Sequence, residues 1–174
     1  MKTPFLKMHG TGNDFVVLDA RARDLTMDAA LAISLSDRHF GIGCDQLLVL
    51  KPSTQADAFM QIFNADGSEI STCGNATRCV ADFLMRERGS SEATIETGAG
   101  IRSGKRTEHG EVEVNMGAPR LSWQEIPLAE SRNTLHLGLE LGLLRDPVAV
   151  NMGNPHIIFF VHDLAHVKMA EWGV

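Results

Sequence analysis

Residues 63–75 read Phe-Asn-Ala-Asp-Gly-Ser-Glu-Ile-Ser-Thr-Cys-Gly-Asn, and they decide the fold of this chain. The residues before this stretch alternate well enough for a strand, and Asp66-Gly67 is typical of a hairpin turn, because glycine tolerates a positive φ. After the stretch, apolar residues recur with a helical period as far as Gly89, which favours the end of a helix. The sequence therefore predicts a strand, a tight turn and then a helix with Cys73 at its amino end.

The position of Cys73 indicates chemistry. The first turn of a helix offers free backbone N–H groups and the positive end of the helix dipole, and both favour a thiolate. A thiolate can act as a base or as a nucleophile, and the same N–H groups can hold a carboxylate. The sequence thus indicates a reaction centre, or half of one, at Cys73.

The composition is that of a globular chain, since 44% of its 174 residues are hydrophobic and 22% are charged. A formal net charge of −6, without a run of Lys or Arg, argues against nucleic acid as the main partner. No apolar run has the length of a membrane span, and the amino end lacks the apolar core of a secretory signal. Three cysteines are too few for a disulfide framework, so a reducing cytoplasm is the expected location.

Periodicity and turn residues predict the remaining elements. A helix capped by Thr26 or Asp28 is expected to lead to His39 and to end at Gly41 and Gly43. Strands are expected at residues 15–18, 46–50, 58–63, 93–97, 101–107, 111–116, 134–139, 147–151 and 156–161. Residues 164–174 are expected to begin a further helix.

The chain also shows a candidate domain boundary and a short internal repeat, which we call the internal echo. Gly117-Ala118-Pro119 predicts one domain over residues 1–117, which carries Cys73, and the start of a second over residues 118–174. Residues 8–19 resemble residues 151–163, because both place Gly-Asn before an apolar strand that ends at an acidic residue. The echo predicts a duplicated architecture whose second half is incomplete within this sequence.

Five blocks of sequence follow one another at characteristic spacing. They are Met8-His9-Gly10-x-Gly12-Asn13-Asp14-Phe15, Gly41-Ile42-Gly43-x-Asp45-Gln46, Phe63-Asn64-Ala65-Asp66-Gly67-Ser68-Glu69, Cys73-Gly74-Asn75 and Met152-Gly153-Asn154-Pro155-His156. In their order and spacing they resemble the diaminopimelate epimerase family. The resemblance implies an α/β fold of two similar halves, each a mixed sheet or barrel wrapped around a central helix, with the second half truncated here. It also implies interconversion of LL- and meso-diaminopimelate, in lysine and peptidoglycan precursor biosynthesis, without a cofactor.

The resemblance assigns roles to single residues. It implies that Cys73 is one of two catalytic thiols, and that His156 is a catalytic residue with a supporting part in orientation or polarity. Inverting a stereocentre needs a base on one face and an acid on the other, with donors that stabilise the developing charge. The implied substrate-binding residues are Asn13, Gln46, Asn64, Gly74, Asn75 and Asn154. Side-chain amides both donate and accept hydrogen bonds, which suits a zwitterionic substrate.

Two parts of the family pattern are missing from the sequence. Neither the second catalytic cysteine, in a Cys-Gly-Ser turn, nor the Glu-Arg pair that precedes it occurs in these residues. The 174-residue chain alone is therefore expected to be inactive and to supply one of two thiols. The implied partner is a small amino-acid substrate, and a homodimer is the implied assembly. No metal, nucleic acid or membrane is expected to bind.

Other readings of the sequence stay open. Cys79 and Cys44 are better explained as small packing residues than as reactive groups. The same fold could serve a proline racemase-type or phenazine-biosynthesis-type isomerase, or the chain could be a non-catalytic domain. A cysteine hydrolase is a weaker alternative, because no histidine and acid follow a recognisable nucleophile arrangement.

Overall fold

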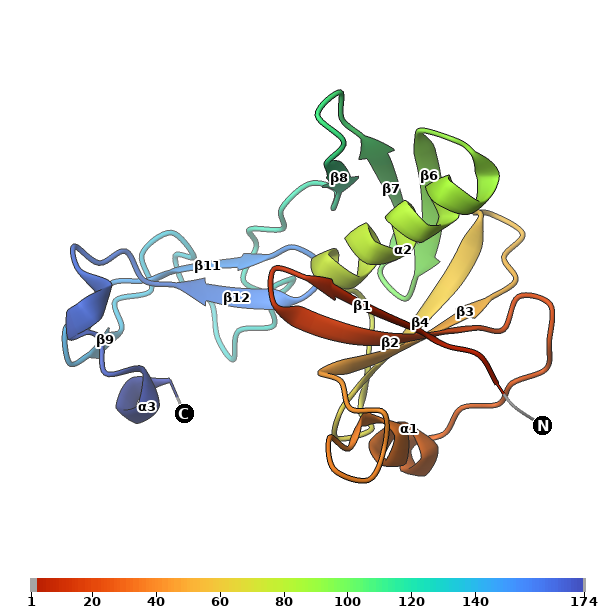
Figure 1. Ribbon diagram of the computed structural model, residues 1–174. Helices are drawn as coiled ribbons and strands as arrows, with labels where there is room; N and C mark the ends of the chain where they lie inside the picture. The colour runs from red at the N-terminus through yellow and green to blue at the C-terminus, as the bar shows by residue number, and fades with distance from the viewer. Residues whose placement is uncertain (1–2, 174) are drawn as a thin grey trace. The chain divides into compact units, whose positions relative to one another are not determined.

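The structure, a computed structural model, describes residues 3–173. The chain divides into two compact units, Met1–Met116 and Gly117–Val174. Unit 1 contains one large sheet with two helices, and unit 2 contains two small two-stranded sheets with two short helical segments (Figure 1). Cys73 and its surroundings therefore belong to unit 1.

The elements of unit 1 alternate in a way that fits the predicted α/β class. In chain order they are β1 (Leu6–Gly10), β2 (Asn13–Asp19), α1 (Ala29–Ser36), β3 (Gln46–Lys51), β4 (Ala58–Asn64), β5 (Glu69–Ile70), α2 (Gly74–Arg88), β6 (Glu92–Thr97), β7 (Gly100–Arg106) and β8 (Val112–Asn115). Each strand predicted for this part of the chain is confirmed. The sequence does not predict β1 or β5, because β1 is a largely exposed edge strand and β5 has only two residues.

The sheet of unit 1 curls around α2. Its strand order is β1-β2-β3-β4-β6-β7-β8, with β5 paired to β4. Helix α2 contacts β1 at one edge of this order and β7 and β8 at the other, so the sheet must bend around the helix (Figure 1). The expected fold, a mixed sheet wrapped around a central helix, is confirmed.

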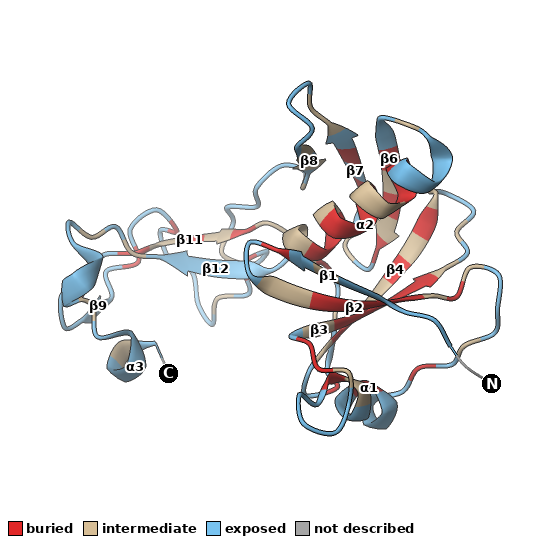
Figure 2. Ribbon diagram, viewed as in Figure 1, coloured by how far each residue is buried: buried red, intermediate tan, exposed pale blue. Residues whose placement is uncertain are grey.

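Both faces of the central strands are buried. Figure 2 shows the buried residues along β2 in red. Phe15 and Val17 pack in the cluster that contains α2 residues such as Leu84. Val16 and Leu18 pack in a second cluster that contains Ala32 of α1. Strands covered on both faces read as continuous apolar runs, which is why β2 stands out in the sequence.

Local residues set the limits of α2. Cys73 is the N-cap, with extended backbone at φ −148° and ψ 119°. Gly89 is the C-cap at φ 64°, a left-handed conformation that glycine adopts without a steric penalty, and its N–H donates to the carbonyl of Met85. The hairpin that precedes the helix turns at Gly67, at φ 82°. The stretch at residues 63–75 thus folds as predicted.

Helix α1 begins as predicted but ends early. The Asp28 carboxylate is its N-cap and accepts from the backbone N–H of Leu31 at 2.8 Å. The prediction that the helix leads to His39 and ends at the glycines that follow is wrong. Asp37 Oδ1 accepts from the backbone N–H groups of His39 and Phe40 at 2.7 and 2.6 Å, which turns the chain away from the helical path.

Unit 2 has short elements. They are β9 (Glu140–Leu141), β10 (Leu144–Arg145), β11 (Val148–Asn151), β12 (Pro155–Ile158), a 3₁₀ helix (Leu164–His166) and α3 (Met169–Trp172). Strands β9 and β10 pair antiparallel, as do β11 and β12. The strand predicted at residues 147–151 is confirmed, and that at residues 156–161 is confirmed only as far as Ile158.

Two predictions for unit 2 are wrong. Residues 134–139 form no strand, because Thr134 and Leu135 lie in a turn in which the Asn133 side chain accepts from the backbone N–H of Leu135 at 3.1 Å. The helix expected from residue 164 is two short segments, separated at Val167, whose backbone is extended. Residue 174 of that expected helix lies outside the described residues.

The internal echo corresponds to a β-hairpin in each unit. Strands β1 and β2 pair antiparallel around Gly12, at φ 88°, with Asn13 as the first residue of β2. Strands β11 and β12 pair antiparallel around Gly153, at φ 111°, with Asn154 directly before β12. Each Gly-Asn pair therefore places a side-chain amide where a hairpin turn enters its second strand.

Candidate active site

Cys73 lies half-buried at the amino end of α2. Its side chain makes no capping hydrogen bond to the helix; instead, Sγ lies 3.8 Å from Asn13 Oδ1, to which the thiol can donate. Gly74 and Asn75 are the first residues of the helix, and the first N–H groups of an α-helix have no intrahelical acceptor. The thiol, an amide and two N–H groups suited to an anion thus meet at one place.

Strand pairing brings three of the predicted amides to the same end of the sheet. β2 begins at Asn13 and β3 begins at Gln46, and the two strands run parallel with Phe15 opposite Gln46. Strand β4 runs the other way and ends at Asn64, which pairs directly with Gln46. Asn13, Gln46 and Asn64 therefore lie at one end of the sheet, and Asn13 joins this end to Cys73.

The amides of Gln46 and Asn64 form a chain of hydrogen bonds. Asn64 Nδ2 donates to Ser68 Oγ at 3.0 Å, and Gln46 Nε2 donates to Asn64 Oδ1 at 3.0 Å. Gln46 Oε1 is buried and has no hydrogen-bond partner among residues 3–173. Buried acceptors are nearly always paired, so this oxygen is suited to a donor from a ligand, such as an ammonium group.

Asn75 is held by the tip of the β1–β2 hairpin. Its Oδ1 accepts from Thr11 Oγ1 at 3.1 Å and from the Arg78 guanidinium at 3.5 Å. A Cβ atom at Gly10 would lie 3.3 Å from the Asn75 Cβ, so glycine at this position lets the hairpin approach the helix closely. The glycine of the Met-His-Gly block is explained by this contact between β1 and α2.

A network of charged residues lies beside Asn13. Asp14 accepts from Arg38 at 2.7 Å and from Lys7 at 2.6 Å, and Arg38 also donates to Asp45 at 2.7 Å. The Arg38 guanidinium, together with Lys7 and the Asp45 backbone N–H, holds the pKa of the Asp14 carboxyl far below its usual range, although partial desolvation opposes this. Asp14 is therefore ionised throughout the neutral range.

Asp14→Asn is expected to reduce the free energy of unfolding at pH 7 by about 1–2 kcal/mol, because it removes the charge that Arg38 and Lys7 share. The pKa in the folded state lies below the unfolded value of about 3.9, so ionised Asp14 stabilises the fold above that pH. This stabilisation is lost as the pH falls through the folded value. Urea unfolding of both proteins should show a deficit at pH 7 that shrinks below pH ~4; an equal deficit at every pH would contradict this.

The other two cysteines are packing residues, as the sequence predicts. Cys44 is 1% exposed, and its thiol lies 3.4 Å from Ser36 Oγ. Cys79 is 6% exposed, and burial raises the pKa of its thiol to about 11. Both thiols lie inside the core of unit 1, which leaves Cys73 as the accessible thiol of the described chain.

Asn154 and His156 belong to unit 2, where both are exposed. His156 Nε2 lies 3.0 Å from Asn154 Oδ1 across the start of β12. The turn before them is held by Asn151, whose Oδ1 accepts from the Gly153 N–H at 2.7 Å. These two predicted residues thus contact each other within their own hairpin.

Sequence reasoning missed two members of the site. Asp45 accepts from Asn13 Nδ2 at 3.1 Å, and Thr11 donates to Asn75 at 3.1 Å. Both residues lie within the blocks of sequence quoted above, Asp45 directly before Gln46 and Thr11 between two glycines. An acid next to an amide at the start of a strand is the signal that could have identified Asp45.

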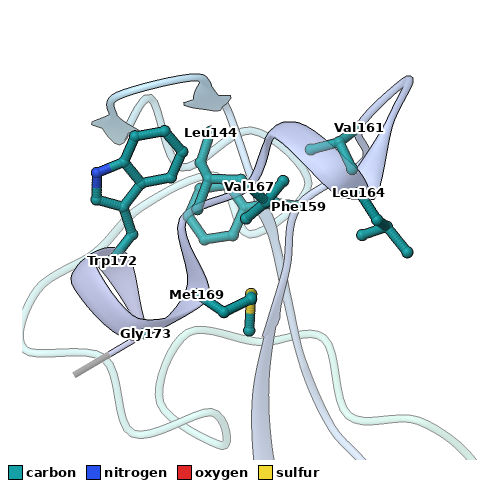
Figure 3. Close-up of a pocket in the computed structure, with 8 residues that line it drawn as sticks. All are labelled: Leu144, Phe159, Val161, Leu164, Val167, Met169, Trp172 and Gly173. Carbon is teal, nitrogen blue, oxygen red and sulfur yellow. The ribbon is translucent and has the colours of Figure 1, made fainter.

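Unit 2 contains an apolar pocket of about 250 Å³, shown in Figure 3. Its lining includes Leu144, Phe159, Val161, Leu164, Met169 and Trp172. None of these side chains is an acid, a base or a nucleophile. The chemistry of the chain is therefore better sought at Cys73 than in this pocket.

Neither a metal-ligating cluster nor a membrane-spanning helix occurs in residues 3–173. These residues contain no cluster of three or more His, Cys, Asp or Glu side chains with the spacing of a metal site. Over the same residues, no helix combines the length and the apolar character needed to cross a bilayer.

Two solved structures have the fold described above. A probable proline racemase from Agrobacterium radiobacter K84 superimposes with a TM-score of 0.64 at 15% identity, over 99% of this chain and 54% of that protein. A phenazine biosynthesis protein of the PhzF family from Bacillus anthracis gives a TM-score of 0.61 at 26% identity, over 95% of this chain and 58% of that protein. The chain therefore has the fold that these two proteins share.

Sequence comparison defines the family. Residues 5–122 match the family model described as diaminopimelate epimerase. A diaminopimelate epimerase of Acidiphilium cryptum (strain JF-5) is 54% identical over 170 residues, which is 98% of this chain and 61% of that protein. The chain belongs to the diaminopimelate epimerase family. It spans about three fifths of the length of the curated relatives that it matches.

Proposed function

We propose that the protein is a cofactor-independent epimerase that interconverts LL- and meso-diaminopimelate, and that Cys73 supplies one of its two acid/base thiols. The observation that carries the proposal is the accessible Cys73 thiol at the start of α2, beside Asn13 and the first N–H groups of the helix. Epimerisation requires a base on one face of the stereocentre and an acid on the other. Cys73 acts on one face.

The surroundings of Cys73 support binding of an amino acid. The N–H groups of Gly74 and Asn75 would hold the carboxylate at the reacting carbon and stabilise the charge that develops there. The row formed by Asn13, Gln46 and Asn64 offers amide donors and acceptors, including the unpaired Gln46 Oε1, for a zwitterionic group.

The proposal also assigns parts to two residues of unit 2 and to a second thiol. Asn154 would extend the binding set, and His156 would support catalysis through orientation or polarity. The sequence has no cysteine after Cys79, so we place the second thiol outside these 174 residues. The proposal includes a cytoplasmic location and a homodimer, each as an expectation from the family resemblance.

Turnover by the complete gene product tests the proposal. We expect it to form meso-diaminopimelate from the LL isomer without an added cofactor, and to leave proline unchanged. Chiral chromatography of both reactions would measure this. Racemisation of proline with no reaction of diaminopimelate would replace the proposal with the proline racemase alternative.

A further inference from the structure

Asp45 and Asn13 face each other where β3 and β2 begin. Asp45 Oδ2 accepts from Asn13 Nδ2 and from the backbone N–H of Asp14, both at 3.1 Å. The other carboxylate oxygen accepts from Arg38 at 2.7 Å. An ionised carboxylate accepts hydrogen bonds and donates none, so Asn13 must turn its NH₂ group toward Asp45.

This orientation fixes what Asn13 presents to Cys73. With Nδ2 on Asp45, the amide turns Oδ1 toward the thiol, 3.8 Å from Cys73 Sγ. A protonated thiol donates to this oxygen, whereas a thiolate would face its lone pairs. An Asn13 amide rotated by half a turn would offer N–H to the sulfur and would stabilise the thiolate instead.

We infer that Asp45 is a positioning residue, which holds the Asn13 amide so that an acceptor oxygen, and not an N–H donor, faces Cys73. This orientation favours the thiol of Cys73 and so opposes the helix N-terminus, which favours the thiolate. The role of Asp45 in catalysis rests on the proposed function. In that mechanism, a Cys73 that carries its proton would act as the acid of the pair, and the second thiol would act as the base. Asp45 itself touches no reacting atom.

The rate at which iodoacetamide alkylates Cys73 tests this inference without any turnover, because the thiolate is the reactive form. Peptide mapping by mass spectrometry separates Cys73 from the buried Cys44 and Cys79. With Asp45→Ala the amide is free to rotate, and we expect alkylation at neutral pH to rise on the order of three- to tenfold, the equivalent of one hydrogen bond. An unchanged rate in a folded Asp45→Ala protein would overturn the inference.

Matched variants separate positioning from a loss of charge or of fold. Arg38→Met removes the ion pairs but leaves Asn13 on Asp45, so its rate should stay near that of the unmodified chain. Asp45→Asn should also stay near it, because two N–H donors converge on the position of Oδ2 and select the amide oxygen there. A rise in either variant as large as that in Asp45→Ala would contradict the inference.

A double-mutant comparison is the most discriminating test. In an Asn13→Ala background, Asp45→Ala should add less than about twofold, because the group that Asp45 orients is gone; a full additional rise would overturn the inference. Asp45→Ser, whose side chain is too short to reach Asn13, replaces Asp45→Ala if that variant does not fold, with the same expected rise. Because alkylation needs no substrate, a failed epimerase assay leaves this test intact.

Discussion

Cys73→Ala is expected to lower kcat of the complete gene product for LL-diaminopimelate by about 10²- to 10⁴-fold, the usual contribution of a positioned acid or base. The thiol is half-buried, is aligned by Asn13 and lies beside N–H groups that can hold the substrate carboxylate. No other described thiol can substitute for it, since Cys44 and Cys79 are buried. Initial rates from chiral chromatography of the product would measure the loss.

Two further variants control this prediction. Cys79→Ala removes a buried thiol six residues further along the chain. The kcat of this variant, measured per folded molecule, should stay near that of the unmodified protein. Cys73→Ser keeps a donor for Asn13 but replaces the thiol by a far weaker acid. Its kcat should therefore be reduced about as much as that of Cys73→Ala. Turnover by Cys73→Ala at the rate of the unmodified protein would exclude Cys73 from proton transfer.

Leu84→Ala is expected to lower the free energy of unfolding by about 2–5 kcal/mol. Leu84 is fully buried in the cluster that joins α2 to the strands curled around it. Its truncation leaves a cavity where close-packed neighbours cannot fully collapse. Urea unfolding followed by circular dichroism would measure the change.

Leu31→Ala is the matched control for that prediction. Leu31 lies on α1 and is 39% exposed, so the same truncation removes fewer contacts and leaves an opening to solvent rather than a cavity. The expected cost is less than about half that of Leu84→Ala. Equal costs would contradict the assignment of α2 as the centre of the core.

The sequence predicts the fold best where an element is buried on both faces or limited by special residues. Strand β2 follows from its unbroken apolar run, and α2 follows from its period and from Gly89. Strand β1 is missed because an exposed edge strand needs little apolar periodicity. The end of α1 is misplaced because the Asp37 side chain competes for backbone N–H groups before the glycines are reached.

The sequence predicts the position of Cys73, the main residue of the candidate site. It predicts the contacts that support Cys73 only in part. The turn and helix signals around Cys73 locate the thiol, and strand pairing then brings Asn13, Gln46 and Asn64 to the same end of the sheet. The role of Asp45 depends on which way an amide faces, and this follows from hydrogen bonds between residues 32 positions apart. A sequence pattern carries no such information about side-chain orientation.

Transfer of solvent deuterium to the α-carbon of diaminopimelate tests the central claim, that Cys73 exchanges a proton with the stereocentre. The complete gene product would be incubated with LL-diaminopimelate in D₂O without an added cofactor, and the recovered isomers would be analysed by mass spectrometry. We predict that the meso product carries one solvent deuterium at the inverted carbon, and that Cys73→Ala abolishes this incorporation. Product without deuterium, or undiminished incorporation by Cys73→Ala, would contradict the account.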